Sequence, residues 1–284
     1  MRLNYLLILL FLPSFLLAQD GLEGIIVEKY YVSNSQDKKG ELFSGELPEG
    51  SVTYRIFVDL KPGFRFQAAF GSPEHPLRIE STANFYNHIE AGRTHPNILP
   101  ERALRKDLAL LDSWLSVGAA GENHYGVPRA FDNGKPDEYL KFEEGYFKGN
   151  KKVKGIAVGI DDGLERSTEL PFPTFYQMDS CLKFLGSSTN GNRIYIDNGA
   201  WACMGKGAVG ADSLTTNTVL IAQLTTAGDL SFDLNLLIGA PNGTSQKYVY
   251  SNPAYDEWVH KDLKYSGSST KPVKRNKKSR KKNK

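Results

Sequence analysis

The alternation of apolar and polar residues is clearest between residues 219 and 238. In its second half Leu230, Phe232, Leu234, Leu236 and Ile238 share one side, while Ser231, Asp233 and Asn235 share the other; this is the period of a half-buried strand. The first half starts with a fully apolar run, residues 219–222, as expected of a strand covered on both faces. Residues 225–229 supply a turn in which Gly228 is free to take a positive φ. The pattern predicts a β-hairpin.

A second hairpin is predicted from residues 51–60 and 64–70. Val52, Tyr54 and Ile56 begin one alternating face, and Phe64 and Phe66 begin the corresponding face of the second strand. The intervening Lys61-Pro62-Gly63 fits a type II turn, because proline suits its first central position and glycine its second.

Further strands are expected at 22–32, 77–86, 112–118, 139–142, 153–160, 193–197 and 247–251. A helical period occurs once, where Leu104, Leu108 and Leu111 follow Pro100 at helical spacing. About ten strands separated by loops rich in glycine and proline predict an all-β fold. We expect a β-sandwich or jelly-roll-like arrangement of antiparallel sheets with one short helix and long loops.

The N-terminus has the pattern of a signal peptide. Arg2 precedes an apolar run, residues 6–17, and Ala18-Gln19 offers a small-residue cleavage position. A membrane span is the alternative, but it needs about twenty apolar residues, and Pro13 and Asp20 leave this run short. We therefore expect a signal peptide over 1–18, export to the periplasm, the cell surface or the medium, a single domain over 19–265 and no transmembrane segment in the mature chain.

The C-terminus is strongly basic. Nine of the 35 Lys and Arg residues lie among the last fourteen residues and Arg2 lies in the leader, so the remaining chain carries 25 basic against 32 acidic residues, a net charge of −7. We expect residues 266–284 to be a disordered tail that contacts anionic polymers. The alternative is a solubilising end without a partner. The candidate contact residues are Lys274, Arg275, Lys277, Lys278, Arg280, Lys281 and Lys282.

Two cysteines, Cys181 and Cys203, are present in the whole chain. In an oxidising compartment a single pair is most simply a disulfide, and a bridge of this loop length would stabilise the fold by roughly 3 kcal/mol. The alternative is two unpaired, buried thiols.

Several short motifs together resemble a known group of proteins. They are Thr53-Tyr54-Arg55, Phe85-Tyr86, residues 112–118 (DSWLSVG) and residues 220–228 (LIAQLTTAG). In this order they resemble exported β-rich modules of environmental bacteria, over residues 22–238. The resemblance implies a β-sandwich-like fold and export, and it implies no activity. Several of those modules carry a sorting domain or an anchor, whereas this chain ends in the basic tail.

The usual catalytic and metal-binding patterns are missing from the sequence. The five histidines show no zinc-ligand spacing, and there is no Gly-x-Ser-x-Gly elbow. The glycine-rich run at 204–210 lacks the strand and helix of a nucleotide site. Adjacent acids such as Glu143-Glu144 face opposite sides of a strand. We therefore predict no catalytic residue.

No cofactor is predicted either. Calcium is the alternative, because Asp132-Asn133-Gly134, Asp161-Asp162-Gly163 and Asp197-Asn198-Gly199 offer oxygen ligands in loops. The same triplets are ordinary β-turn sequences.

Composition favours binding over catalysis. Trp201 and Tyr125 are candidate contact residues, because aromatic rings on loops stack on sugars or anchor partners, whereas Trp114, inside a strand pattern, is expected in the core. We expect an exported non-catalytic module for adhesion, for the envelope or for extracellular binding. The alternative is a secreted glycoside hydrolase or lyase on a jelly roll, with acids from loops 121–150 and 161–169.

Overall fold

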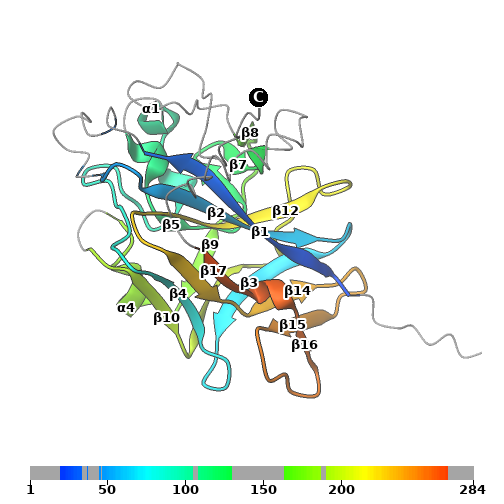
Figure 1. Cartoon of the computed structure of the whole chain (residues 1–284). Coiled ribbons are helices and arrows are strands. Elements are labelled where there is room, and N and C mark those ends of the chain that lie inside the picture. The colour runs from blue at the N-terminus through cyan, green and yellow to red at the C-terminus, as the bar shows by residue number, and fades with distance from the viewer. Residues whose placement is uncertain are drawn as a thin grey trace, which may run out of the picture.

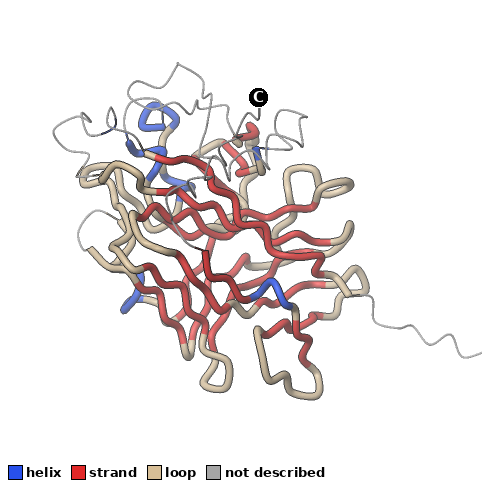
Figure 2. The backbone as a smooth tube through the Cα atoms, in the orientation of Figure 1, coloured by secondary structure: helices blue, strands red, loops and turns tan. Residues whose placement is uncertain are grey.

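The computed structural model describes residues 20–33, 37, 45, 47–104, 108–129, 163–186 and 190–267. Strands dominate these residues (Figure 2), and almost all of them pair antiparallel. The all-β prediction is confirmed. No helix in this part of the chain is long and apolar enough to cross a membrane. The signal peptide, residues 268–284 of the expected tail and the strands expected at 139–142 and 153–160 lie outside the described residues. Ser266 and Gly267 were expected in the disordered tail, but they end a strand, Lys264–Gly267, so that boundary is corrected.

Sheet A forms the middle layer of the molecule. Its order is β1 (Leu22–Val32), β2 (Val52–Leu60), β12 (Asn217–Thr226) and β5 (Trp114–Leu115). Every residue of β12 is buried, which confirms that the apolar run at 219–222 is covered on both faces. Sheet A runs across the picture in Figure 1, with α1 (Glu101–Leu104), β7 (His124–Gly126) and β8 (Leu164–Arg166) on one side and the remaining sheets on the other.

Three further sheets surround sheet A. Sheet B has the order β16 (Glu257–Val259), β15 (Ser245–Val249), β14 (Leu236–Gly239), β3 (Arg65–Gly71), β11 (Gly199–Cys203) and β9 (Pro173–Tyr176). Sheet C has the order β10 (Arg193–Ile196), β4 (Leu77–Ser81), β13 (Leu230–Asp233) and β17 (Lys264–Gly267). Sheet D is small and contains β6 (Ala119–Gly121), β7 (His124–Gly126) and β8 (Leu164–Arg166).

Helical segments are short. They are α1 (Glu101–Leu104), α4 (Asp179–Leu182) and the 3-10 turns η2 (Pro96–Ile98), η3 (Leu108–Leu111) and η5 (Lys261–Leu263). The predicted helix after Pro100 is therefore seen as α1 and η3, and its leucines Leu104, Leu108 and Leu111 are all buried.

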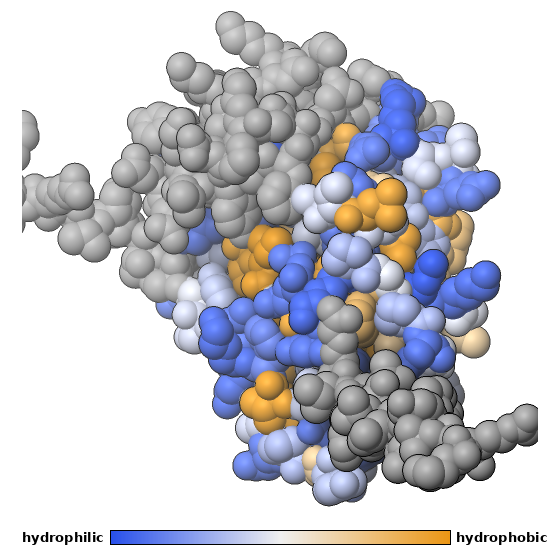
Figure 3. Space-filling view, turned by 90° about the vertical axis from the view of Figure 1, so that its right-hand side faces the viewer, coloured by the Kyte–Doolittle hydropathy of each residue, from blue (hydrophilic) through white to orange (hydrophobic). Residues whose placement is uncertain are grey.

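Apolar side chains form one core on each side of sheet A. The larger core joins residues such as Ile56 of β2 and Ile221 of β12 to Phe66 of β3 and Phe232 of β13. The smaller core joins Phe57 and Leu220, on the opposite face of the same two strands, to the leucines of α1 and η3 and to Trp114. The two cores explain why β2 and β12 are buried on both faces. On the face in Figure 3, hydrophilic residues surround separate apolar areas.

Both predicted hairpins are wrong in their pairing. β12 lies in sheet A, whereas β13 and β14 lie in sheets C and B; likewise β2 lies in sheet A and β3 in sheet B. The turns therefore carry the chain from one layer of the sandwich to the other. The type II turn at 61–64 is nevertheless confirmed, because the Phe64 N–H donates to the Lys61 carbonyl and Gly63 has a φ of 85°.

Gly228 is required for a reason other than the predicted positive φ, which the structure does not show. A Cβ at this position would lie 2.3 Å from the backbone nitrogen of Ala83. The glycine thus permits the close approach of the β12–β13 turn to the segment that follows β4.

Candidate binding pocket

A pocket of about 560 Å³ opens at one end of the sandwich. It lies where β12 ends at Thr226 and β2 begins after Ser51, since Thr226 and Val52 are register partners. The segment after β4 crosses this end, and its Phe85 forms a β-bridge with Thr226. The described lining residues are Gly45, Pro48, Ser51, Ala83, Asn84, Phe85, Tyr86, Asn87, Ile89, Gly186, Asn190, Thr226 and Ala227.

The described lining is uncharged. It contains the amide side chains of Asn84, Asn87 and Asn190, the hydroxyl-bearing residues Ser51, Tyr86 and Thr226, and an apolar portion to which Ile89 contributes an exposed side chain. None of these lining residues carries a carboxylate, an ammonium, a guanidinium, an imidazole or a thiol. The pocket therefore offers neutral hydrogen-bonding groups beside apolar surface.

Hydrogen bonds fix the loops that line the pocket. The Tyr86 N–H donates to the Thr225 carbonyl (2.7 Å), and the Phe85 N–H donates to the Gly191 carbonyl (2.7 Å). The Asn87 side chain donates through Nδ2 to the Phe184 carbonyl (2.8 Å). Its Oδ1 atom is buried and has no hydrogen-bond partner among the described residues.

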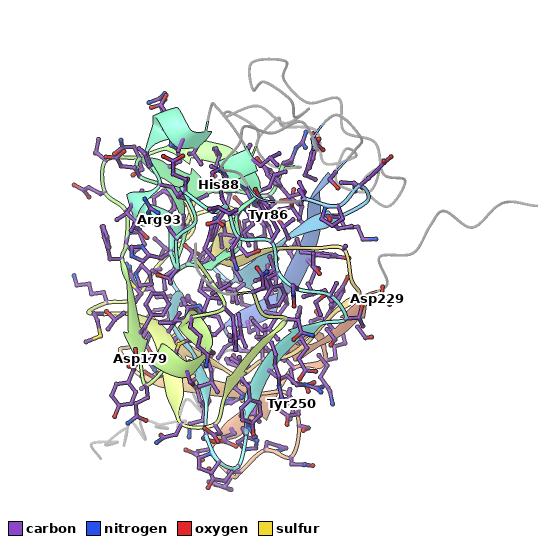
Figure 4. All side chains as sticks on the ribbon, turned by 90° about the vertical axis from the view of Figure 1, so that its left-hand side faces the viewer. Tyr86, His88, Arg93, Asp179, Asp229 and Tyr250 are labelled. Atoms are coloured by element: carbon purple, nitrogen blue, oxygen red, sulfur yellow. The ribbon has the colours of Figure 1, made fainter. Side chains whose placement is uncertain are left out.

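The rim of the pocket is anchored by a buried carboxylate. Asp112 accepts hydrogen bonds from the backbone N–H groups of His88 (2.8 Å) and Arg93 (2.9 Å), and the Ala91 N–H donates to His88 Nδ1 (2.9 Å). Burial raises the pKa of Asp112 to about 7, although these backbone donors and the charge of Arg93 oppose the rise. Figure 4 shows Tyr86, His88 and Arg93 gathered in the upper part of the molecule, away from Tyr250.

A second polar cluster lies on the same face of sheet A as Asp112, next to the smaller core. The Arg55 guanidinium is buried, donates to Gln223 Oε1 and to the Gly163 carbonyl (both 2.8 Å), and lies 3.5 Å from the centre of the Tyr30 ring. The Arg129 N–H donates to Glu28 Oε1 (2.8 Å). This cluster packs inside the molecule, so it stabilises the fold rather than presenting a binding surface.

Gln223 connects the buried arginine to the pocket rim. Its Nε2 donates to the carbonyls of Leu110 (2.9 Å) and Asp112 (2.8 Å), while its Oε1 accepts from Arg55. Through Gln223, strand β12 thereby positions the backbone of Asp112, and the Asp112 carboxylate holds the rim of the pocket. The sequence places Arg55, Gln223 and Asp112 in predicted strands. It gives no indication that the three side chains contact one another.

The predicted disulfide is not formed. Cys181 lies in α4, is buried and donates from Sγ to the Met178 carbonyl (3.2 Å), and Cys203 ends β11 as a half-buried free thiol. Burial raises the pKa of both thiols. Each cysteine is held by its own element, α4 or β11, and the structure therefore corrects the prediction to two separate thiols.

The two aromatic candidates do not line the pocket. Trp201 in β11 is fully buried in the larger core, so the prediction that it contacts a ligand is wrong. Tyr125 in β7 is half-buried and lies beside Gly118, away from the lining. The tail candidates, Lys274 to Lys282, lie outside the described residues.

Metal ligands do not converge in the described part of the chain, where no group of three or more His, Cys, Asp or Glu side chains could hold an ion. Asp197 and Asn198 occupy the turn between β10 and β11, and the other two predicted calcium triplets fall mainly outside the described residues.

Comparisons with known proteins found no match: no family model, no curated protein and no solved structure is similar to this chain. The resemblance to exported β-rich modules therefore stays a prediction.

Proposed function

We propose that this protein is an exported, non-catalytic binding module whose pocket takes an uncharged, hydroxyl-rich ligand such as a short glycan. The observation that carries the proposal is the described lining of the pocket, which combines three asparagine side chains and apolar surface without an ionisable acid or base. Amides both donate and accept hydrogen bonds, as sugar hydroxyls require. Pockets of a few hundred Å³ with a few placed polar groups are typical small-ligand sites.

The alternative, a glycoside hydrolase or lyase, needs at least a pair of acid and base groups across the bound sugar. The described lining supplies neither, so the pocket supports binding rather than cleavage. Acids in loops 121–150 and 161–169, which the alternative would use, fall largely outside the described residues; those described, Glu122, Glu165 and Glu169, do not line the pocket.

Export is part of the same proposal and rests on the N-terminal pattern. Residues just beyond the expected cleavage position are already held in the fold: the Tyr248 hydroxyl donates to Asp20 Oδ1 (2.6 Å) and accepts from the Gly21 N–H (2.9 Å). Cleavage after Ala18 would thus leave the first contacts of β1 intact. We further propose that the basic tail binds anionic surface polymers independently of the pocket.

Titration calorimetry with a panel of neutral and acidic oligosaccharides tests the pocket. Asn84→Ala and Asn190→Ala remove exposed amides that line the pocket and make no side-chain hydrogen bond within the described part of the chain. They should therefore weaken binding of the neutral ligand about tenfold or more while leaving unfolding unchanged. The matched control is Asn198→Ala, an exposed asparagine in the β10–β11 turn. The proposal would be contradicted if all three variants bound the oligosaccharide as tightly as the wild-type protein does. Release of new reducing ends during incubation would also contradict it.

A further inference from the structure

The last strand of the described chain ends beside the pocket. Strand β17 finishes at Gly267, which pairs with Leu230 of β13, and Leu230 in turn pairs with Ser81 of β4. Since neighbouring strands lie about 4.8 Å apart, Gly267 is roughly 10 Å from Ser81. The Ser81 hydroxyl forms a 2.7 Å hydrogen bond with the hydroxyl of Thr226, a lining residue of the pocket. The basic residues that follow Gly267 therefore leave the fold next to the pocket.

The β12–β13 turn and the segment after β4 connect this point to the pocket wall. The Thr82 N–H donates to the Asp229 carbonyl (3.1 Å), and the Asp229 N–H donates to the Thr82 hydroxyl (2.9 Å). Ala83 and Ala227, from the same segment and the same turn, line the pocket. The wall of the pocket and the end of β17 are thus parts of one hydrogen-bonded unit, so the fold fixes the separation between them.

The cations of the C-terminal sequence begin close to this point. Lys271 is four residues beyond Gly267, and the other eight of the nine cations lie within residues 274–284. Covalent geometry lets four residues span up to about 14 Å, which is comparable with the distance from Gly267 to the pocket. Cations of residues 268–284 can therefore meet a ligand that extends out of the pocket.

The folded surface beside the end of β17 carries balanced charge. On the outward face of sheet C, Arg78 forms ion pairs with Glu80 (3.3 Å) and Asp233 (2.7 Å). Arg193 pairs with Glu80 (2.7 Å), and the Lys264 ammonium lies 3.7 Å from the carboxylate of Asp233. Each of these cations already faces a carboxylate, so an anionic ligand gains little from them. The nine C-terminal cations, in contrast, lie in a sequence without an acidic residue.

The pocket and the C-terminal cations offer different chemistry. The described lining has amides and hydroxyls but no cation, so a carboxylate or sulfate group inside the pocket would lose water without gaining an ion pair. A run of Lys and Arg attracts such anions, but its attraction does not depend on which sugars carry them. A glycan that contains both neutral sugars and acidic groups would satisfy the pocket and the cations together.

We propose that the ligand is an acidic glycan, of which a neutral sugar occupies the pocket while neighbouring carboxylate or sulfate groups bind the cations of residues 268–284. The proposal rests on the proposed function, because it requires that the pocket takes a neutral sugar. Each contact forms without the other, but on one glycan the second contact forms at an effective concentration on the order of millimolar. The acidic glycan should therefore bind at least about tenfold more tightly than a neutral one of the same length.

Calorimetry of the mature chain, residues 19–284, with short oligosaccharides of equal length tests the proposal. Neutral probes are cello-, manno- and chito-oligosaccharides, mixed probes are hyaluronan and chondroitin sulfate fragments, and oligogalacturonate is purely acidic. The tightest ligand should be a mixed probe, and the responses to hyaluronan and chondroitin sulfate distinguish carboxylate from sulfate. Replacing the nine cations by Gln should weaken this ligand at least about tenfold and leave the neutral probes unchanged. Asn84→Ala should weaken both kinds of probe.

The matched control keeps the charge and changes its position. Residues 268–284 are removed from the C-terminus and joined ahead of Gln19. This end of the chain enters the fold at Leu22, which pairs with Leu60, whereas the pocket lies at the other end of β2, beside Val52. Nine residues of β2 separate the two ends by roughly 30 Å. The variant should be retained on heparin resin but should bind the mixed probe only as weakly as the Gln variant does.

Two results would overturn the proposal while the proposed function stands. One is equal affinity of wild type for neutral and mixed probes, with both weakened by Asn84→Ala. The other is full affinity for the mixed probe in the variant with the relocated cations. If binding of every probe is unaffected by Asn84→Ala and Asn190→Ala, the proposed function of the pocket fails, and this proposal fails with it.

Discussion

The backbone N–H of His88 donates a 2.8 Å hydrogen bond to the fully buried carboxylate of Asp112. The same carboxylate accepts from Arg93 at the other end of this loop. One side chain thus fixes both ends of the segment from His88 to Arg93, which follows Asn87 and contains Ile89, two residues that line the pocket. Because burial raises its pKa to about 7, the anchor titrates near neutral pH.

Asp112 should give the protein a characteristic pH dependence. Its folded pKa lies above the ordinary aspartate value of 3.8, so between about pH 4 and 7 the folded state holds a proton that the unfolded state has lost. The stabilisation is fully present below about pH 4 and disappears as the pH rises through about 7, a change on the order of a few kcal/mol. Urea unfolding of Asp112→Asn across this range should show a flatter profile than wild type. Asp256→Asn, at an exposed loop position, should keep the wild-type profile; an unchanged slope in Asp112→Asn would refute the assignment.

Arg55 should be among the most sensitive positions for stability. Arg55→Ala removes the donor to Gln223 Oε1 and the cation from the face of Tyr30, and it leaves a void between sheet A and the covering layer. We expect a loss of about 3 to 5 kcal/mol in the free energy of unfolding, and a smaller but clear loss for Arg55→Lys, which lacks the planar fork. Arg193→Ala is the control: its ion pair with Glu80 (2.7 Å) is solvent-exposed and should contribute under about 1 kcal/mol. Similar losses in the free energy of unfolding at Arg55 and Arg193 would show that the buried contacts of Arg55 contribute no more than an exposed ion pair.

Inward-facing residues could be predicted from the sequence, but strand partners could not. The alternation from Leu230 to Ile238 identifies five side chains that are all buried, because the period of a strand is a local property. Whether β12 pairs with β13 depends on layers formed by residues far away in sequence. A turn signal is compatible both with a hairpin and with a crossing between sheets.

Polar residues show the same limit. Asn235 was expected on the solvent side, yet it is buried and donates through Nδ2 to the carbonyls of Phe70 and His75. At the break between β13 and β14 the amide supplies a donor to the Phe70 carbonyl of β3, and it also binds the His75 carbonyl of the turn closed by the Ser72 N–H. The pocket could not be predicted from the sequence either. Its asparagines come from two separate loops, and these loops approach each other only in the complete sandwich.

Neighbouring residues on β13 should differ sharply in their effect on stability. Phe232 is buried and stacks on Tyr265 at 5.2 Å between ring centres, so Phe232→Asp would bury an unpaired charge and cost about 4 kcal/mol or more. Asp233 is largely buried but forms an ion pair with the more exposed Arg78 (2.7 Å), and Asp233→Ser should cost about 1 kcal/mol. Thermal and urea unfolding of both variants measure the difference. Equal losses would mean that the facing of β13 is misassigned.

The basic tail should govern attachment to anionic polymers, because nine cations lie in the last fourteen residues whereas the body has a net charge of −7. Each Lys or Arg that neutralises a phosphate-like or sulfate-like charge releases counterions, so retention on heparin resin should fall steeply between about 50 and 200 mM salt. Truncation after Gly267 keeps β17 complete and should abolish retention without changing the melting temperature. A full-length variant with the nine tail Lys and Arg residues replaced by Gln separates charge from length and should behave like the truncation. If either variant is retained as strongly as wild type, the folded body and not the tail carries the binding.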